Sequence, residues 1–368
     1  MYTSEHLYSI ALRRCKQIGD ISFSKLIKAF GSAENAWKEN KSLIKSITGI
    51  NKNAVSDIGK AEHLIFAEKE LEFCYHNKIT INLRHHNHLP YYLDDCIDAP
   101  SILYQKGIYN PDLLPISIVG TRNSTMYGKE FIQDFLHQIS THNSITVSGL
   151  AFGIDTEVHQ KSVEYKIPTI AVLAHGLHML YPAGNKRLAE SILEHDGLLV
   201  TEFNSHQKPD REHFLQRNRI IAGLSRHLIV VETAFGGGSI NTASYGNVYN
   251  REVFALPGKI SDKYSQGCNQ LIFQNKAIAI STIKDLISMI GLESKKEIAE
   301  LFPEKTIQLN FNKDQKLVYD CILTNNNISL DDLVEKTKLL PHQLLPILLD
   351  LEISQHIKSN SGRQFSKF

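Results

Sequence analysis

The chain has 368 residues, which is too long for one small hydrophobic core and predicts two or three domains. Apolar residues make up 42% of the chain and charged residues 21%, as is ordinary for a soluble globular protein. Its 40 basic and 39 acidic residues leave a formal net charge of +1. The whole molecule is therefore not strongly basic, and any site for an anion must be a local cluster of charge.

The cysteines and the apolar runs indicate a cellular compartment. The five cysteines are scattered and form no CxxC pair, which argues against a disulfide framework or a zinc site and favours a reducing compartment. The N-terminus lacks the apolar segment of a signal peptide, and no apolar run approaches the roughly 20 residues that span a bilayer. We therefore expect a cytoplasmic protein that makes no membrane contact.

Residues 1–75 carry apolar residues at helical spacing and predict a helical N-terminal domain. The segment Ile47–Ile50 resembles the turn of a helix-hairpin-helix motif, in which Gly49 would adopt a positive φ and backbone amides would face a DNA phosphate. Four residues make a weak motif, so an ordinary tight turn in a small helical bundle is the simpler interpretation.

Residues 76–115 connect this domain to the next, and residues 102–107 predict a short strand within the connector. The connector also contains His85, His86 and His88. Neighbouring side chains of an extended segment point in opposite directions, and no carboxylate or cysteine stands beside these histidines at ligand spacing. We therefore expect a surface loop and no metal site.

Residues 116–290 alternate short β-rich runs with helical stretches of about 10–15 residues. This alternation predicts an α/β fold with a Rossmann-like, doubly wound and mostly parallel sheet. With its leading connector, the predicted domain spans residues 76–290.

Two further segments complete the predicted organisation. Residues 291–310 are rich in charge and predict a linker. The tail, residues 311–368, combines three helical patterns with a hairpin around Asn360, Ser361 and Gly362, which is typical of a small winged-helix-like domain.

In a doubly wound sheet, ligands bind outside the carboxyl ends of the strands. The first strand of the series ends in Gly120-Thr121-Arg122. A glycine turn that opens a helix presents free amides and the positive end of the helix dipole, and Arg122 adds a guanidinium that fits a phosphate. Neither a GxGxxG nor a P-loop pattern is present, so a mononucleotide or a nucleic-acid backbone fits better than a dinucleotide.

The second strand ends at Ser148 and Gly149, and Gly153 follows four residues later. Two glycines at this spacing permit close approach of the backbone to a ligand. On the next helix, Asp155 and His159 share a face and could form an acid–base pair. The simpler interpretation is that Asp155 caps the helix and His159 packs beside it.

Basic side chains mark the third and fourth βα units. Lys186 stands near a helix start, where it could meet a phosphate or remain solvated. Arg217-Asn218-Arg219 lies within an otherwise apolar helix, and arginines two positions apart cannot share one helix face. We expect one arginine to reach the ligand cleft and the other to pair with a carboxylate, for which Glu202 is the candidate.

The fifth strand is followed by Gly236-Gly237-Gly238-Ser239. Consecutive glycines before a helix form a second nest of amides for an anion, and Ser239 is placed to cap the helix. A hydrolase nucleophile at Ser239 would require a GxSxG elbow, which is absent.

Taken in chain order, these motifs resemble those of the DNA-processing protein A family, also called DprA or Smf. The resemblance covers residues 110–285 most strongly, and the flanking regions are similar to the helical N-terminal and winged-helix-like C-terminal domains of that family. The motifs that carry it include Gly120-Thr121-Arg122, Tyr127-Gly128, Ser148-Gly149-Leu150-Ala151, Tyr181-Pro182, Arg217-Asn218-Arg219, Phe254-Ala255-Leu256-Pro257-Gly258 and Gly267-Cys268-Asn269-Gln270.

The resemblance implies a recombination mediator with no catalytic residue, metal or cofactor. Such proteins bind and protect incoming single-stranded DNA during natural transformation and help to load the RecA recombinase onto DNA coated by single-strand binding protein. They usually act as homodimers through the Rossmann-like domain. Carried onto this chain, the resemblance implies that Arg122 and the amides around Gly120 and Gly238 contact the DNA backbone, and that Arg217 and Arg219 belong to the same pocket.

Some positions depart from the family pattern. Phe152, Ala183 and the pair Gly236-Gly237 stand where many members carry lysine or arginine. Fewer cations predict a weaker phosphate contribution and a shallower dependence of binding on salt. Phe152 would either stack on a base or pack in the core.

Two other functions must be weighed. A nucleotide-processing enzyme similar to the lysine-decarboxylase-like phosphoribohydrolases would also use a late glycine-rich loop, but it would place a glutamate shortly after the glycines. Here Ser239-Ile240-Asn241-Thr242 follows Gly238, and no acid is present. A pure interaction module built on the winged helix is the third possibility, which a deletion of residues 305–368 would separate from DNA binding by the sheet.

Overall fold

The computed structural model describes residues 2–292, 311–325, 327–354, 356–360 and 364–367. The chain divides into two compact units, residues 1–294 and residues 295–368. Of the predicted linker, residues 293–310 lie outside the described residues, whereas Leu292 is buried in the core of the first unit.

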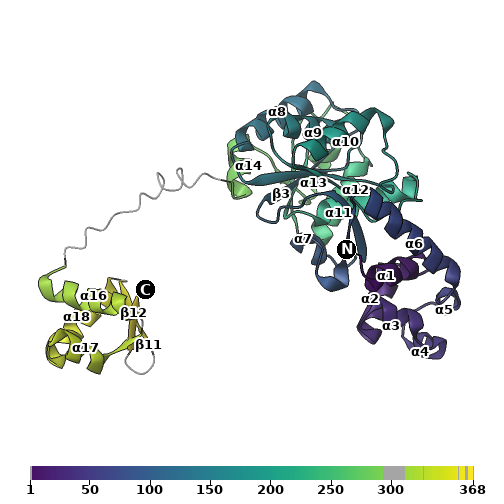
Figure 1. The fold of residues 1–368 in the computed structure, drawn as a ribbon. Coiled ribbons are helices and arrows are strands. Elements are labelled where there is room, and N and C mark those ends of the chain that lie inside the picture. Colours follow the sequence, from purple (N-terminus) through teal and green to yellow (C-terminus); the bar gives the residue numbers. More distant parts are fainter. Residues whose placement is uncertain (1, 293–310, 326, 355, 361–363, 368) are drawn as a thin grey trace. The chain divides into compact units, whose positions relative to one another are not determined.

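The first unit begins with a bundle of helices, drawn in purple in Figure 1. These helices are α1 (Ser4–Arg14), α2 (Asp20–Phe30), α3 (Ala33–Lys38), α4 (Lys41–Ser46), α5 (Lys52–Asp57) and α6 (Ala61–His76). Their buried side chains, such as Phe23 and Leu26, belong to one cluster that also includes Ile81 and Tyr104 of the neighbouring sheet edge. The bundle therefore packs directly on the sheet and shares its core.

The turn at Ile47–Ile50 joins the two short helices α4 and α5. Gly49 has φ +82°, a conformation that glycine adopts without strain, as the hairpin motif requires. The Thr48 carbonyl accepts a hydrogen bond of 3.1 Å from the Lys25 ammonium group. The turn is thus tied to α2 of its own bundle.

One nine-stranded sheet forms the centre of the unit, in the order β1-β2-β6-β5-β4-β3-β7-β8-β9. The strands are β1 (Thr80–Leu83), β2 (Ile102–Gly107), β3 (Leu114–Val119), β4 (Ser144–Ser148), β5 (Thr169–Val172), β6 (Leu198–Thr201), β7 (His227–Val230), β8 (Glu252–Ala255) and β9 (Ile278–Ala279). All pairings from β6 to β9 are parallel, while β1 and β2 form an antiparallel edge. Every residue of the inner strands β4, β5, β6 and β7 is buried, because helices cover both faces.

The covering helices divide between the two faces, as Figure 1 shows. One face carries α8 (Met126–Ile139), α9 (Ile154–Glu164), α10 (Lys186–Glu194) and α14 (Ile283–Met289). The other carries α7 (Tyr91–Asp94), α11 (Arg211–Gly223), α12 (Gly238–Val248) and α13 (Gln266–Phe273). The inner strands are covered by one helix layer on each face, which is the doubly wound arrangement that the alternating pattern predicts.

The connector is more ordered than the sequence suggested. The predicted strand at residues 102–107 is confirmed as β2, and β1 pairs with it. Between them, Arg84–His86 forms a 3-10 turn, and the His85 side chain is 11% exposed and lies 2.6 Å from the Glu5 carboxylate. The expectation of a surface loop is therefore wrong for His85, because the fold brings α1 against this turn.

The second unit contains α16 (Lys313–Thr324), β10 (Ile328–Ser329), α17 (Leu330–Thr337), α18 (Pro341–Ile353), β11 (Ile357–Asn360) and β12 (Gln364–Lys367). Its three strands pair in the antiparallel order β10-β12-β11, and one apolar core, with Val318, Leu333 and Leu348, joins them to the three helices. This is the predicted order of three helices and a β-ribbon; of the predicted hairpin residues, Ser361 and Gly362 lie outside the described residues.

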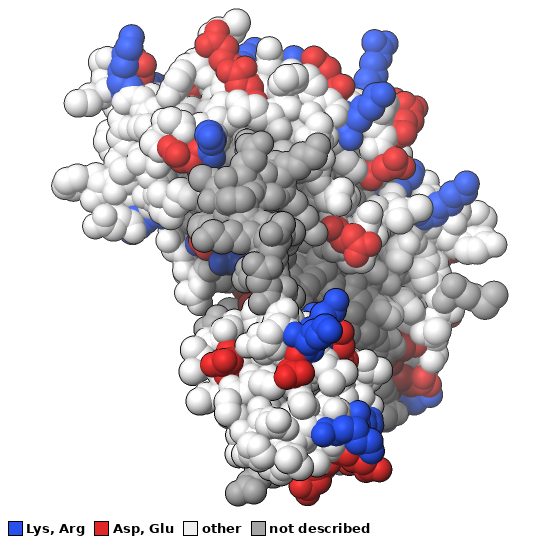
Figure 2. Space-filling view, turned by 90° about the vertical axis from the view of Figure 1, so that its left-hand side faces the viewer, with Lys and Arg blue, Asp and Glu red and all other residues white. Residues whose placement is uncertain are grey.

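Charge is evenly mixed on the surface that Figure 2 shows, where basic and acidic side chains are interspersed and neither sign forms a continuous patch. This agrees with the formal net charge of +1. Within the described residues, no helix is both long and apolar enough to cross a membrane.

Candidate nucleic-acid interface

A pocket of about 940 Å³ lies at the point where the strand order reverses. The chain runs outward from β3 through β4 and β5 to β6, then returns to β7 on the other side of β3. The loops after β3 and β7 consequently diverge, and a crevice opens between them, as expected at the switch point of a doubly wound sheet. The loops that follow these two strands, with α11, provide most of the lining.

Eight of the predicted site residues line this pocket: Gly120, Thr121, Arg122, Arg217, Asn218, Gly237, Gly238 and Ser239. Six others are not among its lining residues: Ser148, Gly149, Phe152, Gly153, Lys186 and Arg219. The structure therefore brings together the first loop, the glycine nest and part of α11.

The loop Gly120–Arg122 forms the first wall of the pocket. It leads into α8, whose N-cap residue Thr125 is held by Glu232. The buried Glu232 carboxylate accepts hydrogen bonds from the Thr125 amide at 2.9 Å and from the Thr125 hydroxyl at 2.5 Å. A carboxylate at the end of β7 thus fixes the loop after β3, while Arg122 itself stays exposed and free to meet a ligand.

The glycines after β4 allow other segments of the chain to pack closely against this loop; they were expected to make room for a ligand. A side chain at Gly153, which has φ +80°, would overlap the Thr121 and Arg122 backbone. A side chain at Gly149 would overlap the Arg217 guanidinium. This loop supports the Gly120–Arg122 loop from behind, and the nearby Ser148 hydroxyl donates to the Ile118 carbonyl at 2.7 Å.

The two arginines of α11 have separate roles. Arg217 reaches the pocket lining but is only 4% exposed, and its guanidinium donates to the carbonyls of Gly149, at 2.6 Å, and Val172. Burial lowers the pKa of Arg217 to about 10, and the nearby Asp155 carboxylate opposes this shift. Arg217 therefore ties the ends of β4 and β5 together beneath the pocket.

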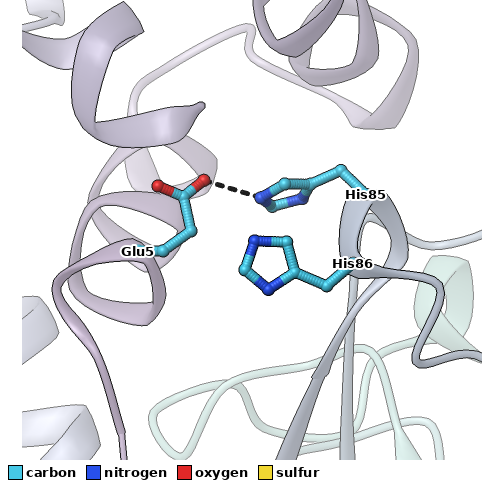
Figure 3. Close-up of side chains that lie close together, drawn as sticks. All are labelled: Glu5, His85 and His86. Atoms are coloured by element: carbon cyan, nitrogen blue, oxygen red, sulfur yellow. Dashed lines mark hydrogen bonds and ion pairs between the residues drawn. The ribbon is translucent and has the colours of Figure 1, made fainter. Parts of the chain in front are cut away.

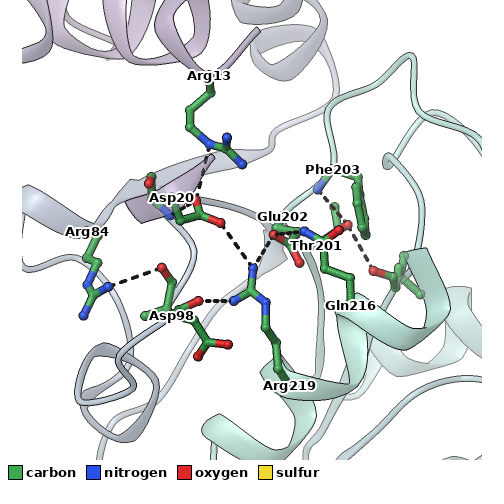
Figure 4. A network of polar contacts seen from close by, with 12 residues as sticks. Arg13, Asp20, Arg84, Asp98, Thr201, Glu202, Phe203, Gln216 and Arg219 are labelled. Carbon is green, nitrogen blue, oxygen red and sulfur yellow. Dashed lines mark hydrogen bonds and ion pairs between the residues drawn. The ribbon is translucent and has the colours of Figure 1, made fainter. Parts of the chain in front are cut away.

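Arg219 points away from the pocket, so its assignment to the same site is wrong. It lies in the network of Figure 4, where its guanidinium is 2.6 Å from Glu202 and 3.4 Å from Asp20. The predicted pair with Glu202 is confirmed. Burial raises the pKa of Glu202 to about 7, although Arg219 opposes the shift. Because Asp20 belongs to α2, this arginine joins the helical bundle to the sheet.

The glycine nest forms the opposite wall of the pocket. Gly237 is the N-cap and α12 begins at Gly238, where a side chain would meet only open space. The prediction that Ser239 caps the helix is therefore wrong by two positions. Its hydroxyl is buried in the pocket lining with no hydrogen-bond partner among the described residues.

Phe152 and Lys186 both lie outside the pocket lining. The Phe152 side chain is 53% exposed and rests against Gly184, so the alternative that it packs in the core is wrong. Lys186 is the exposed first residue of α10. Both remain candidates only for an extension of a bound strand beyond the pocket.

Residues that were not predicted complete the pocket. Lys208, Arg211 and Phe214 line it beside the predicted Arg122. The Phe214 ring centre lies 5.3 Å from the Arg122 guanidinium carbon and 5.8 Å from the Tyr181 ring centre. The signal was present in the sequence as two cations and an aromatic just before and within the first turn of the Arg217 helix.

Asp155 and His159 do not form an acid–base pair. The Asp155 carboxylate accepts from the Ala151 amide at 3.4 Å, and burial raises its pKa. His159 is fully buried and hydrogen-bonds the Thr169 hydroxyl at 2.8 Å. The simpler interpretation is correct for His159, which packs in the core. It is wrong for Asp155, because the N-cap of α9 is Gly153 and no side chain of the described residues caps this helix.

The sequence profile described as DNA recombination-mediator protein A matches residues 80–291, and the profile described as DprA winged helix domain matches residues 312–363. The chain belongs to the DNA recombination-mediator protein A family. Membership confirms the resemblance seen in the motifs, the Rossmann-like α/β fold class and the winged-helix nature of the second unit.

Individual relatives support the family assignment along most of the chain. Protein Smf of Synechocystis sp. is 31% identical over 296 residues, which are 79% of this chain and 74% of the relative. The crystal structure of DNA processing protein A from Streptococcus pneumoniae matches with a TM-score of 0.65 and 29% identity, covering 78% of this chain and 98% of that one. A structure of the same protein from Helicobacter pylori, described for its single-stranded DNA binding mode, matches with a TM-score of 0.53 and 25% identity, over 58% of this chain and 96% of that one.

Proposed function

We propose that this chain binds single-stranded DNA in the switch-point pocket and acts as a recombination mediator in natural transformation. The observation that carries the proposal is the convergence, in one pocket, of an exposed arginine loop, a helix N-terminus and a pair of aromatic rings. Family membership and the DNA-binding mode named for the Helicobacter pylori relative support it.

The phosphate backbone would be held by the two walls of the pocket. Its lining contains four basic side chains (Arg122, Lys208, Arg211 and Arg217) and two acidic ones (Asp155 and Asp210), an excess of positive charge. The first turn of α12 adds free amides and the positive end of its dipole, which favours an anion. The pocket therefore provides a local cluster of positive charge, as an anion site on a nearly neutral chain requires.

The bases would be held by stacking. Phe214 and Tyr181 lie in contact at the rim, and Tyr181 is 45% exposed. An aromatic face accepts any base and contributes about 1–3 kcal/mol per stacked base. Binding of this kind depends weakly on sequence, as a protein that receives arbitrary incoming DNA requires.

The pocket favours binding over catalysis. The two carboxylates of its lining both serve the backbone, since Asp155 accepts from the Ala151 amide and Asp210 caps α11 through the Glu212 amide at 2.8 Å. A phosphoribohydrolase would require a free carboxylate directed at the ribose. We infer that the pocket holds DNA without cleaving a glycosidic bond, and incubation with nucleoside 5′-monophosphates should release no free base.

Three finer parts of the proposal rest on the family alone. We infer that the chain protects the bound strand, loads RecA onto DNA coated by single-strand binding protein, and acts as a cytoplasmic homodimer through the Rossmann-like domain. Strand exchange by RecA on coated DNA, measured with and without this protein, tests the loading step. No stimulation of strand exchange would contradict it while leaving DNA binding intact.

The DNA site itself is tested by Arg122→Ala, measured by fluorescence anisotropy with a labelled oligothymidine at several salt concentrations. Loss of one charge-assisted phosphate contact of about 1.5–3 kcal/mol should weaken binding about ten- to a hundredfold. The slope of log affinity against log salt should fall by about 0.7.

A matched control separates the site from general electrostatics. Arg226 is also exposed, pairs with Glu252 at 3.0 Å and is not part of the pocket lining, so Arg226→Ala should change neither affinity nor salt slope. Equal effects of the two substitutions would show that the pocket is not the binding site. Unchanged binding in Arg122→Ala would overturn the assignment of the loop.

A further inference from the structure

A second cluster of titratable side chains joins the helical bundle to the connector and shares no residue with the DNA pocket. Figure 3 shows Glu5, from the first turn of α1, facing His85 and His86 of the 3-10 turn. One potential ligand atom from each residue lies within 4.8 Å of the other two. No carboxylate or cysteine stands beside these histidines in the sequence, but the fold supplies the Glu5 carboxylate from 80 positions away.

The carboxylate of this cluster is held firmly in place. Glu5 is 8% exposed, and its two oxygens accept from the amides of Ala33, at 2.6 Å, and Glu34, at 3.2 Å, at the start of α3. Such outer contacts orient a carboxylate ligand and limit its movement. The position of Glu5 is therefore set by the bundle and not by the histidines alone.

The His85 ring hydrogen-bonds that carboxylate through its Nε2 atom. Its Nε2 atom lies 2.6 Å from Glu5 Oε1, while Nδ1 is buried with no hydrogen-bond partner among the described residues. A neutral imidazole carries one proton, and this arrangement places it on Nε2, between the ring and the carboxylate. A metal ion at this position would replace that single proton.

His86 and His88 provide the open side of the cluster. The His86 ring centre lies 4.6 Å from that of His85 and 5.5 Å from that of His88, and both His86 and His88 are exposed. An ion can therefore enter from solvent, and His88 or a water can complete four ligands. Tetrahedral ligand atoms at 2.0–2.1 Å from zinc lie about 3.3 Å apart. The 2.6 Å contact between Glu5 and His85 must therefore open when the ion replaces the shared proton, and the exposed His86 must move inward.

We propose that Glu5, His85 and His86 form a binding site for one zinc-class divalent ion, which links α1 of the helical bundle to the turn between strands β1 and β2 at the sheet edge. One carboxylate and two imidazoles are ligands that zinc accepts, and an exposed third imidazole stands beside them. The bound ion would lock the bundle onto the sheet, since its ligands come from both.

The experiment uses the full chain without a polyhistidine tag, stripped of metal with EDTA and titrated with ZnCl₂ by calorimetry. We expect one ion per chain, and at least a tenfold loss of affinity in His86→Ala. Glu5→Gln should show a similar loss, while its amide oxygen still accepts from the Ala33 amide. Zinc should also raise the thermal midpoint of the parent chain, but much less that of His86→Ala.

The control is His76→Ala, because His76 and Glu72 form an exposed histidine–glutamate pair of 3.9 Å on α6. Its zinc affinity should equal that of the parent chain. A second buried group, Cys15, Asp57 and His63, is distinguished by Cys15→Ser and by the thiolate band of bound Co²⁺. Absence of binding, or binding that His86→Ala leaves unchanged and Cys15→Ser abolishes, would overturn the proposal and leave the DNA site unaffected.

Discussion

Replacement of Arg219 by alanine tests whether this arginine stabilises the fold and takes no part in DNA binding. The Arg219 guanidinium donates to Glu202 at 2.6 Å and to the Asp98 carbonyl at 2.5 Å, with Asp20 at 3.4 Å. Its side chain is 7% exposed and that of Glu202 only 2%. Arg219→Ala would leave a carboxylate buried without its counter-charge.

The magnitude follows from this burial. Removal of one partner from a buried ion pair costs about 3–5 kcal/mol, because the remaining charge must be desolvated or neutralised. The exposed pair Arg226–Glu252 is the control, and Arg226→Ala should cost less than about 1 kcal/mol. The substitution at Arg219 should also loosen the helical bundle, since Asp20 belongs to α2.

The assay is urea unfolding, followed by circular dichroism and by fluorescence of Trp37, the single tryptophan, which is buried in the bundle. We expect a lower midpoint for Arg219→Ala by both probes, with affinity for oligothymidine retained under conditions where the protein is folded. Unchanged stability combined with lost DNA binding would refute the structural role of Arg219 and return it to the DNA site.

Three further predictions concern a buried histidine, a close backbone contact and the second unit. His159 is fully buried, and burial lowers its pKa from 6.5 to about 3. The unfolded chain therefore binds a proton at this residue first, so the free energy of unfolding should fall as pH drops below 6.5, by about 4–5 kcal/mol near pH 3. In acid unfolding, the difference in stability between the parent chain and His159→Gln should shrink over that range. Gly153→Ala should lower both stability and DNA affinity, since its Cβ would displace the Arg122 backbone; unaltered anisotropy curves would contradict this. Deletion of residues 305–368 should retain oligothymidine binding, and its loss would favour the winged helix as the binding module.

The sequence predicted the elements of the site better than their roles. Glycine after a strand indicates a tight turn wherever it occurs, so the loops at Gly120, Gly149 and Gly238 were all found. The presence of a glycine does not reveal which group packs against it in the folded protein. At Gly149 the neighbour is the Arg217 guanidinium, and only at Gly238 does the backbone face open space.

Periodicity alone was sufficient to predict the fold class, the doubly wound sheet and the order of elements in the winged helix. The spacing of apolar residues within each segment indicates a strand or a helix without reference to distant residues. Contacts between distant segments were decided by the tertiary structure. The sequence named Arg122 as a site residue and Glu202 as the partner of one arginine of α11. The structure decided that this arginine is Arg219 and added Asp20 as a second partner. The physical reason is that a charge takes its role from the partners and solvent around it, and those are set by packing between residues as far apart as 199 positions.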